Sequence, residues 1–212
     1  FTGSITTAQT INRAMAANMP ASAPLIAETG GLNAMIVDST ALPEQVVKDV
    51  IDSAFQSAGQ RCSSLRMLYL QEDIADKVLQ MLNGAMDELQ IGDPWEVTTD
   101  VGPVIDETAK ARIWEHCDRH KRQGKILKQL TPPAQGRFVS PTVIQLSGIE
   151  ELEEEIFGPV APLLRFQDEQ QAISMANETE FGLAAYFYTR DNARIWRVSE
   201  GLEYGIVGVN CG

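Results

Sequence analysis

Short apolar, β-prone segments alternate with amphipathic helical patterns along the whole chain, and this alternation limits the possible folds more than any other feature. The helical patterns carry apolar residues at three- and four-residue spacing, the strand patterns are short, and turn residues separate them. Strands are expected near 33–37, 65–70, 125–130, 142–144, 163–166, 185–188 and 206–209, and helices near 4–19, 43–55, 74–82, 106–123, 170–177 and 193–200. Such alternation is typical of an α/β fold, a mostly parallel sheet with helices on both faces.

Charge and cysteine content exclude several classes of function. The 212 residues include 17 basic and 29 acidic side chains, a net charge of -12, which disfavours nucleic acid and anionic membranes as partners. No apolar run approaches the roughly 18 residues of a membrane span. Three widely spaced cysteines, without a metal-ligand spacing, indicate a reducing compartment, and we expect a cytoplasmic protein.

The two ends of the chain suggest a piece of a longer protein. Phe1 is not a methionine, and residues 1–4 have the pattern of a strand end that leads into a helix. The last residues, 205–210, have the pattern of a strand with almost nothing after it. Natural domains rarely begin and end inside secondary structure, so we expect this chain to be a fragment.

Cys62 lies in a small polar turn, 57–64, between a helical pattern and a strand pattern. A thiol near positive charge or backbone N–H groups can be a reactive thiolate, whereas a buried cysteine is usually inert. Arg61 is the adjacent charge. Glu28, before Thr29 and two glycines, is a carboxylate that could activate water against a thioester. Both residues are expected where a strand ends and a helix starts, as sites in α/β sheets commonly are. Residue types alone still favour a packing cysteine and a solvated glutamate.

Other polar groups give weaker signals. His116 and His120 share a helix face beside Cys117, but no third ligand is evident and the helix reads as polar all round, so a solvated face is the simpler interpretation. The acidic run 150–155 ends in Glu155, Ile156, Phe157, Gly158 and Pro159, which implies a fixed turn presenting a carboxylate and a ring together.

Four segments together resemble the ordered motifs of the NAD(P)-dependent aldehyde dehydrogenases, and the resemblance covers essentially all 212 residues. They are Phe1-Thr2-Gly3-Ser4, Glu28-Thr29-Gly30-Gly31, Gly59-Gln60-Arg61-Cys62 and Glu155-Ile156-Phe157-Gly158-Pro159. The resemblance implies that 1–212 is the thiol-bearing catalytic domain. It also implies that the N-terminal cofactor-binding segment, an oxyanion-hole asparagine and a C-terminal oligomerising arm lie outside this chain. We therefore expect an inactive fragment of a protein that forms a homo-oligomer.

The resemblance also implies a role for each motif. Cys62 would attack the aldehyde, with its own N–H as half of the oxyanion hole, and Glu28 would be the base for thioester hydrolysis. The implied cofactor is NAD, with NADP as the alternative. Its expected contacts are Ser4 near the pyrophosphate, Thr29 and Gly30 in the adjoining turn, Glu155 on the nicotinamide ribose, and Phe157 beside the nicotinamide.

Two branches of the family are represented. The stretches 26–38, 57–63 and 100–106, together with Ala8, resemble the glutamate-semialdehyde (1-pyrroline-5-carboxylate) dehydrogenase part of proline utilisation A. In that branch Ser63 and Arg61 would contact the substrate aldehyde or carboxylate. The stretches 157–163 and 175–184 look more like succinate-semialdehyde dehydrogenases. Those usually carry Thr before the catalytic cysteine and a second Cys two residues after it, where this chain has Arg61 and Ser64. Succinate semialdehyde as substrate, and a non-catalytic relic of the fold, are the alternatives to glutamate semialdehyde.

Overall fold

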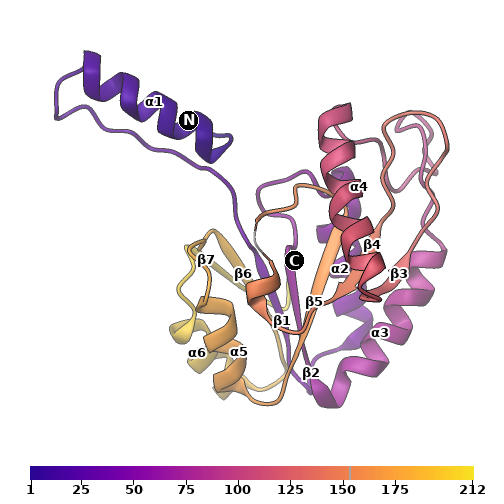
Figure 1. Cartoon of the computed structure of the whole chain (residues 1–212). Helices are drawn as coiled ribbons and strands as arrows, with labels where there is room; N and C mark the ends of the chain where they lie inside the picture. Colours follow the sequence, from indigo (N-terminus) through magenta and orange to yellow (C-terminus); the bar gives the residue numbers. More distant parts are fainter. Residues whose placement is uncertain (153) are drawn as a thin grey trace.

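The chain forms one seven-stranded, mostly parallel sheet, as the alternation predicts (Figure 1). The computed structural model describes residues 1–152 and 154–212, so Glu153 of the acidic run lies outside the described residues. The strand order is β3-β4-β5-β2-β1-β6-β7, and every neighbouring pair is parallel except β3 and β4. The strands are β1 (Ala34–Val37), β2 (Met67–Gln71), β3 (Ile126–Gln129), β4 (Thr142–Gln145), β5 (Val160–Phe166), β6 (Ala184–Tyr188) and β7 (Ile206–Val209).

The core lies around β1, an inner strand next to the middle strand β2, and β1 is buried along its whole length. Its continuous apolar sequence, rather than an alternating one, fits a parallel strand that is covered on both faces. Ile36 pairs in register with Tyr69 of β2 and with Phe187 of β6, and all three side chains are buried.

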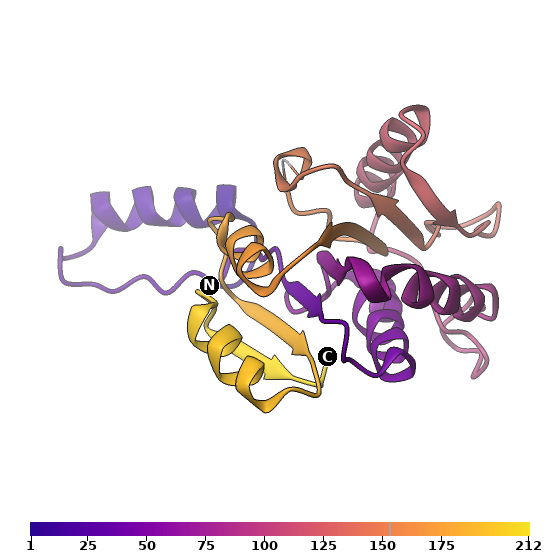
Figure 2. The same ribbon diagram turned by 90° about the horizontal axis from the view of Figure 1, so that it is seen from below.

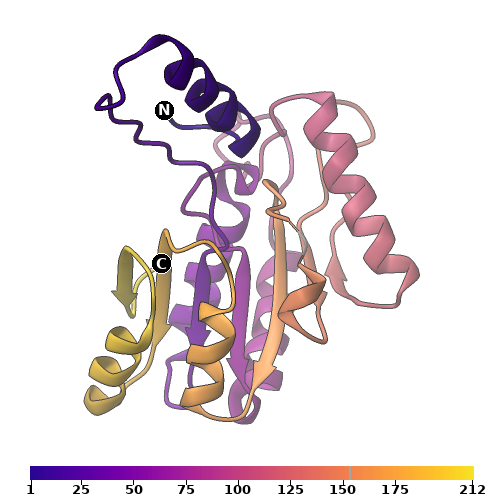
Figure 3. The same ribbon diagram turned by 60° about the vertical axis from the view of Figure 1, so that its left-hand side comes forward.

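Helices cover both faces of the sheet. In Figure 3, α5 (Glu169–Asn177) lies in front of the central strands, whereas α2 (Pro43–Phe55) and α3 (Glu72–Asp87) lie behind them. The helix α6 (Asn192–Gly201) packs beside α5, and two short 3-10 helices, η1 (Gln56–Gly59) and η2 (Ile149–Glu151), complete the connections. Each expected helix is present, with boundaries that shift by a few residues.

The first helix, α1 (Ile5–Asn18), lies apart from the sheet in Figure 1. Ser4 is its N-cap, as its sequence position suggests, and Ala8 is its buried residue. A backbone pairing anchors the start of the chain, because the Gly3 N–H donates to the Glu28 carbonyl and the Glu28 N–H donates to the Phe1 carbonyl. No helix in the described part of the chain has the length and apolar character of a membrane span.

The interpretation of the polar helix, α4 (Glu107–Arg122), as a solvated element is wrong. Ile113, His116, Cys117 and His120 are buried, and they lie at helical spacings of three, one and three residues. This stripe faces the sheet, where the Cys117 thiol lies near the hydroxyl of Thr142. In Figure 2 the pink α4 lies on one side of the brown strands β4 and β5, opposite the purple helices α2 and α3. Two histidines take core positions here, so a count of apolar residues underestimates the buried face.

Candidate active site

The turn that carries Cys62 follows a sharp change of backbone direction after α2. Ser57 (φ 54°) and Ala58 (φ 51°) are left-handed within η1, and Gly59 (φ 64°) follows in the same region. A left-handed conformation costs an L-residue about 1–2 kcal/mol, so other contacts must hold this turn. Backbone strain of this kind often occurs where a functional side chain is presented.

Asn33 provides one set of those contacts. Its Nδ2 donates to the carbonyl of Cys62 at 2.6 Å and to that of Ser64 at 2.8 Å, while its Oδ1 accepts from the Ala184 N–H at 3.2 Å. The side chain is fully buried just before β1. One amide therefore ties the Cys62 turn to the starts of β1 and β6, a role that sequence reasoning missed.

The side chains of the turn itself point in different directions. Cys62 is exposed, and Ser63 is half-buried. Arg61 is exposed and its Nη2 donates to the Asp52 carbonyl of α2 at 2.8 Å, while its N–H donates to the Ser64 hydroxyl. In the described residues no acceptor takes the Cys62 N–H.

The turn that follows Glu28, rather than Glu28 itself, approaches Glu155. Within the described residues, Glu28 bonds through its backbone alone and its side chain is exposed. Gly30 has φ 123°, and a Cβ there would lie 2.5 Å from Glu155 Oε2, so the close approach requires glycine. The Gly31 N–H donates to the same oxygen at 3.4 Å, and Thr29, which precedes Gly30 in the chain, is half-buried.

The turn from Glu155 to Gly158 meets the Cys62 turn directly. A Cβ on Gly59 would lie 2.2 Å from the Gly158 carbonyl oxygen, so these two backbones are in contact. Phe157 presents a ring that is 38% exposed, and the Glu155 side chain is 15% exposed. The carboxylate and the ring expected in this turn are therefore both partly accessible.

Arg66, immediately before β2, joins the two turns, and sequence reasoning did not single it out. The side chain is 2% exposed. Toward the Cys62 turn, its Nη2 donates to the Gly59 carbonyl at 2.7 Å and to the Arg61 carbonyl at 3.1 Å. Toward the other turn, its Nε donates to Glu155 Oε1 at 3.1 Å and its Nη1 donates to the Gly158 carbonyl at 3.4 Å. Its Cζ lies 5.1 Å from the centroid of the Phe157 ring. Burial lowers the pKa of Arg66 and the ion pair with Glu155 opposes that shift, while arginine stays charged in either case.

This cluster lies where strands begin, which corrects the expected placement of Glu28 and Cys62. Asn33 precedes β1, Arg66 precedes β2 and Gly158 precedes β5. Both candidates therefore precede strands instead of following them. The reason is that the crossover helix α2 carries the chain from the end of β1 back to the start of the parallel strand β2, and the Cys62 turn lies at that start.

Ser4 is not joined to the Cys62 turn by any contact within the described residues. Its hydroxyl bonds to Thr7 at the start of α1. Its connection to the site is indirect, through the pairing of Gly3 with Glu28. The expected phosphate-binding role of Ser4 thus stays a prediction.

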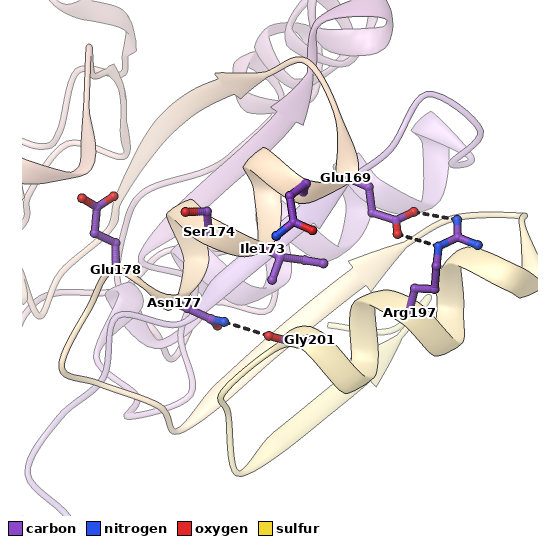
Figure 4. Close-up of a pocket in the computed structure, with 8 residues that line it drawn as sticks. Glu169, Ile173, Ser174, Asn177, Glu178, Arg197 and Gly201 are labelled. Atoms are coloured by element: carbon purple, nitrogen blue, oxygen red, sulfur yellow. Dashed lines mark hydrogen bonds and ion pairs between the residues drawn. The ribbon is translucent and has the colours of Figure 1, made fainter.

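A separate polar groove lies between α5 and α6 (Figure 4). Glu169 and Arg197 form an ion pair across it, and Asn177 donates to the Gly201 carbonyl. These contacts join the two helices. The groove contains none of the candidate site residues.

The comparisons with known proteins agree on one family. The aldehyde dehydrogenase family model matches residues 1–212. The chain is 47% identical over 223 residues to the bifunctional protein PutA of Salmonella typhimurium, covering 99% of this chain and 17% of that protein. It is 41% identical to the succinate-semialdehyde dehydrogenase [NADP(+)] GabD of Escherichia coli, covering 87% of this chain and 39% of that enzyme.

A solved structure gives the same result for the fold. A crystal structure of the bifunctional proline utilization A (PutA) protein superposes with a TM-score of 0.95 and 45% identity, covering 100% of this chain and 22% of that one. The chain therefore spans a small part of the length of the PutA proteins that it matches.

Proposed function

The chain belongs to the aldehyde dehydrogenase family, and we propose that it supplies the thiol-bearing part of an enzyme that oxidises glutamate 5-semialdehyde to glutamate with NAD in proline catabolism. The observation that supports this most is the contact between the exposed Cys62 turn and the Glu155–Gly158 turn through Arg66 and Gly59. A nucleophile and a carboxylate–ring pair from distant parts of the sequence thereby share one site. The likeness to PutA supports the choice of substrate.

Cys62 performs the first step in this proposal. Its thiolate attacks the aldehyde carbon, a C–S bond forms, and the carbonyl oxygen becomes an alkoxide. The Cys62 N–H, which no protein acceptor takes within the described residues, donates to that oxygen. Asn33 holds the turn through the Cys62 carbonyl and so fixes the position of this N–H.

Glu155 and Phe157 fit a nicotinamide nucleotide. Both side chains are partly exposed, and the buried Arg66 guanidinium contacts both of them. The Glu155 carboxylate can therefore accept hydrogen bonds from ribose hydroxyls while the Phe157 ring packs on a flat base. A nicotinamide nucleotide held by Glu155 and Phe157 would supply the hydride acceptor that the oxidation of the Cys62 adduct to a thioester requires. Gly30 borders the same carboxylate, and Thr29, which precedes it, and Ser4, at the pyrophosphate, are assigned to the cofactor by resemblance.

Glu28 completes the reaction. Its exposed carboxylate takes a proton from water, the water oxygen attacks the thioester carbonyl, and the C–S bond breaks to release the acid and the Cys62 thiolate. Arg61 and Ser63 flank the nucleophile, where a cation and a hydroxyl can bind the carboxylate or the aldehyde of the substrate.

The test is NADH formation by the full-length protein that carries these residues, with glutamate semialdehyde as substrate. Cys62→Ser is expected to lower kcat by about 1,000-fold or more, because the nucleophile is lost. Glu28→Gln is expected to leave a single burst of NADH and to stop later turnovers. A Cys62→Ser protein with undiminished NADH formation would refute the assignment.

A second candidate substrate is succinate semialdehyde, which the likeness to GabD favours. The ratio of kcat/KM for the two semialdehydes decides between them, and we expect glutamate semialdehyde to be preferred. A chain that binds neither aldehyde nor NAD would be a structural relic of the fold.

A further inference from the structure

Arg66 contacts two functional turns at once. Two of its five contacts are with the Cys62 turn, at the carbonyls of Gly59 and Arg61. The other three are with the Glu155–Gly158 turn, at the Glu155 carboxylate, the Phe157 ring and the Gly158 carbonyl. The two turns are 89 residues apart in sequence where Arg66 meets Glu155. We propose that Arg66 is a positioning residue that sets the distance between the Cys62 nucleophile and the cofactor-binding turn. The proposal rests on the proposed dehydrogenase function.

The chemistry of the guanidinium explains why an arginine stands here. Its donors lie in one plane and point in fixed directions, so one rigid group can hold oxygens from two backbones. A lysine at the same place has one nitrogen and reaches fewer of these acceptors. Because the side chain is buried, water cannot replace the lost bonds without opening the contact between Gly59 and Gly158.

Hydride transfer is sensitive to the distance between the Cys62 nucleophile and the cofactor-binding turn. Attack of the thiol on the substrate is less sensitive to that distance. The Cys62 carbonyl is also held by Asn33, so the nucleophile keeps one support when Arg66 is altered. Glu155 has a weaker second contact, from the Gly31 N–H at 3.4 Å. An altered Arg66 should therefore displace the cofactor-binding turn relative to the thiol, and a displacement near 1 Å can cost about 100-fold in rate.

The experiment compares Arg66→Lys with wild type in the full-length protein. We expect the Kd of NAD to rise about tenfold and single-turnover hydride transfer to fall about 10- to 100-fold. Hydrolysis of p-nitrophenyl acetate, which needs Cys62 but no hydride transfer, should stay within about threefold of wild type. Equal losses in all three measurements, or no loss in any, would overturn the positioning role.

Arg165→Lys is the matched control. Arg165 also bridges two groups, donating to Glu72 at 2.8 Å and to Asp76 at 2.7 Å, but it lies near the other end of the sheet at the close of β5. The Arg165→Lys substitution should leave the Kd of NAD, the rate of hydride transfer and the rate of ester hydrolysis at wild-type values. The double variant Arg66→Lys/Glu155→Gln adds a second test, since residues that act as a unit lose less together than the product of the single losses. Independent, multiplicative losses would contradict the proposal.

Two outcomes separate this inference from the function it depends on. A wild-type protein that oxidises no aldehyde with NAD refutes the proposed function, whatever the variants do. An active wild type with an equally active Arg66→Lys refutes the positioning role alone. If Arg66→Lys and Arg66→Gln both fail to fold while Arg165→Lys folds, Arg66 is a residue of stability and the positioning role is rejected.

Discussion

The three cysteines differ in burial, and this difference separates their chemistry. Cys117 is buried in the stripe of α4, and burial raises the pKa of its thiol to about 11. Cys62 and Cys211 are exposed. Cys62 lies in a turn whose backbone carbonyls accept hydrogen bonds from Asn33 and Arg66, so its exposed thiol is presented in a fixed position.

Alkylation with iodoacetamide is therefore expected to modify Cys62 first, Cys211 next and Cys117 last. Peptide mapping by mass spectrometry after short exposures gives the three rates. An aldehyde substrate should protect Cys62 and leave Cys211 unprotected. Modification of Cys62 no faster than that of the other two would contradict its role as nucleophile.

At the scale of single elements, the Cys62 turn depends on one glycine. Gly59 is left-handed and its Cα hydrogen faces the Gly158 carbonyl, where a Cβ would approach to 2.2 Å. Gly124, after α4, is also left-handed (φ 71°), but a Cβ added there would meet no atom within 4 Å. The two glycines share the backbone conformation and differ in the space around them.

The substitution Gly59→Ala should therefore cost clearly more than Gly124→Ala. The left-handed conformation alone costs about 1–2 kcal/mol, which is the expected effect at Gly124. At Gly59 the forced separation of the two turns should add about 2 kcal/mol or more to the loss in free energy of unfolding. Urea unfolding of this chain measures both losses in free energy of unfolding. Equal losses would show that the contact with Gly158 contributes nothing to stability.

The buried stripe of α4 has a consequence for acid stability. Burial lowers the pKa of His116 to about 4, and His120, Arg119 and Arg112 act in the same direction. The unfolded histidine titrates near 6.5, so the folded state binds fewer protons between these values. The stabilisation is present above pH ~6.5 and is lost as the pH falls towards ~4.

The expected loss from this histidine is about 2 kcal/mol between pH ~7.5 and ~5. Urea unfolding at both pH values measures it for wild type and for His116→Gln. The variant should lose less stability than wild type over this interval. Carboxylates titrate in both proteins, whereas His116 titrates only in wild type. Identical losses would show that His116 is not kept neutral by its surroundings.

At the scale of the whole molecule, the sheet and its site residues lie in one chain, but the relatives are much longer. The chain spans 17% of the PutA protein of Salmonella typhimurium. The proposal places the adenosine contacts and one oxyanion-hole donor, an asparagine, outside these 212 residues. These 212 residues alone should therefore form no NADH from glutamate semialdehyde, while Cys62 still reacts with iodoacetamide. Measurable NADH formation by this chain would contradict the expectation.

Local patterns predicted most of the fold. The helices and strands follow from the spacing of apolar residues, and the mostly parallel sheet follows from their alternation. Turn residues marked the turns at Gly30, Cys62 and Glu155, and the resemblance grouped them into one expected site. The structure connects them through Gly30–Glu155 and Gly59–Gly158 contacts. The catalytic roles of Cys62 and Glu28 stay predictions.

The sequence by itself determined the α/β class and the residues that form the three turns, because periodicity and turn residues report the geometry of neighbouring residues. Only the tertiary structure decided that Arg66 joins two turns, that His116 and His120 are core residues, and that the site lies where strands begin. The physical reason is that burial of a polar side chain depends on partners distant in sequence. For Arg66 these are Glu155 and Gly158, and no local pattern around residue 66 indicates them.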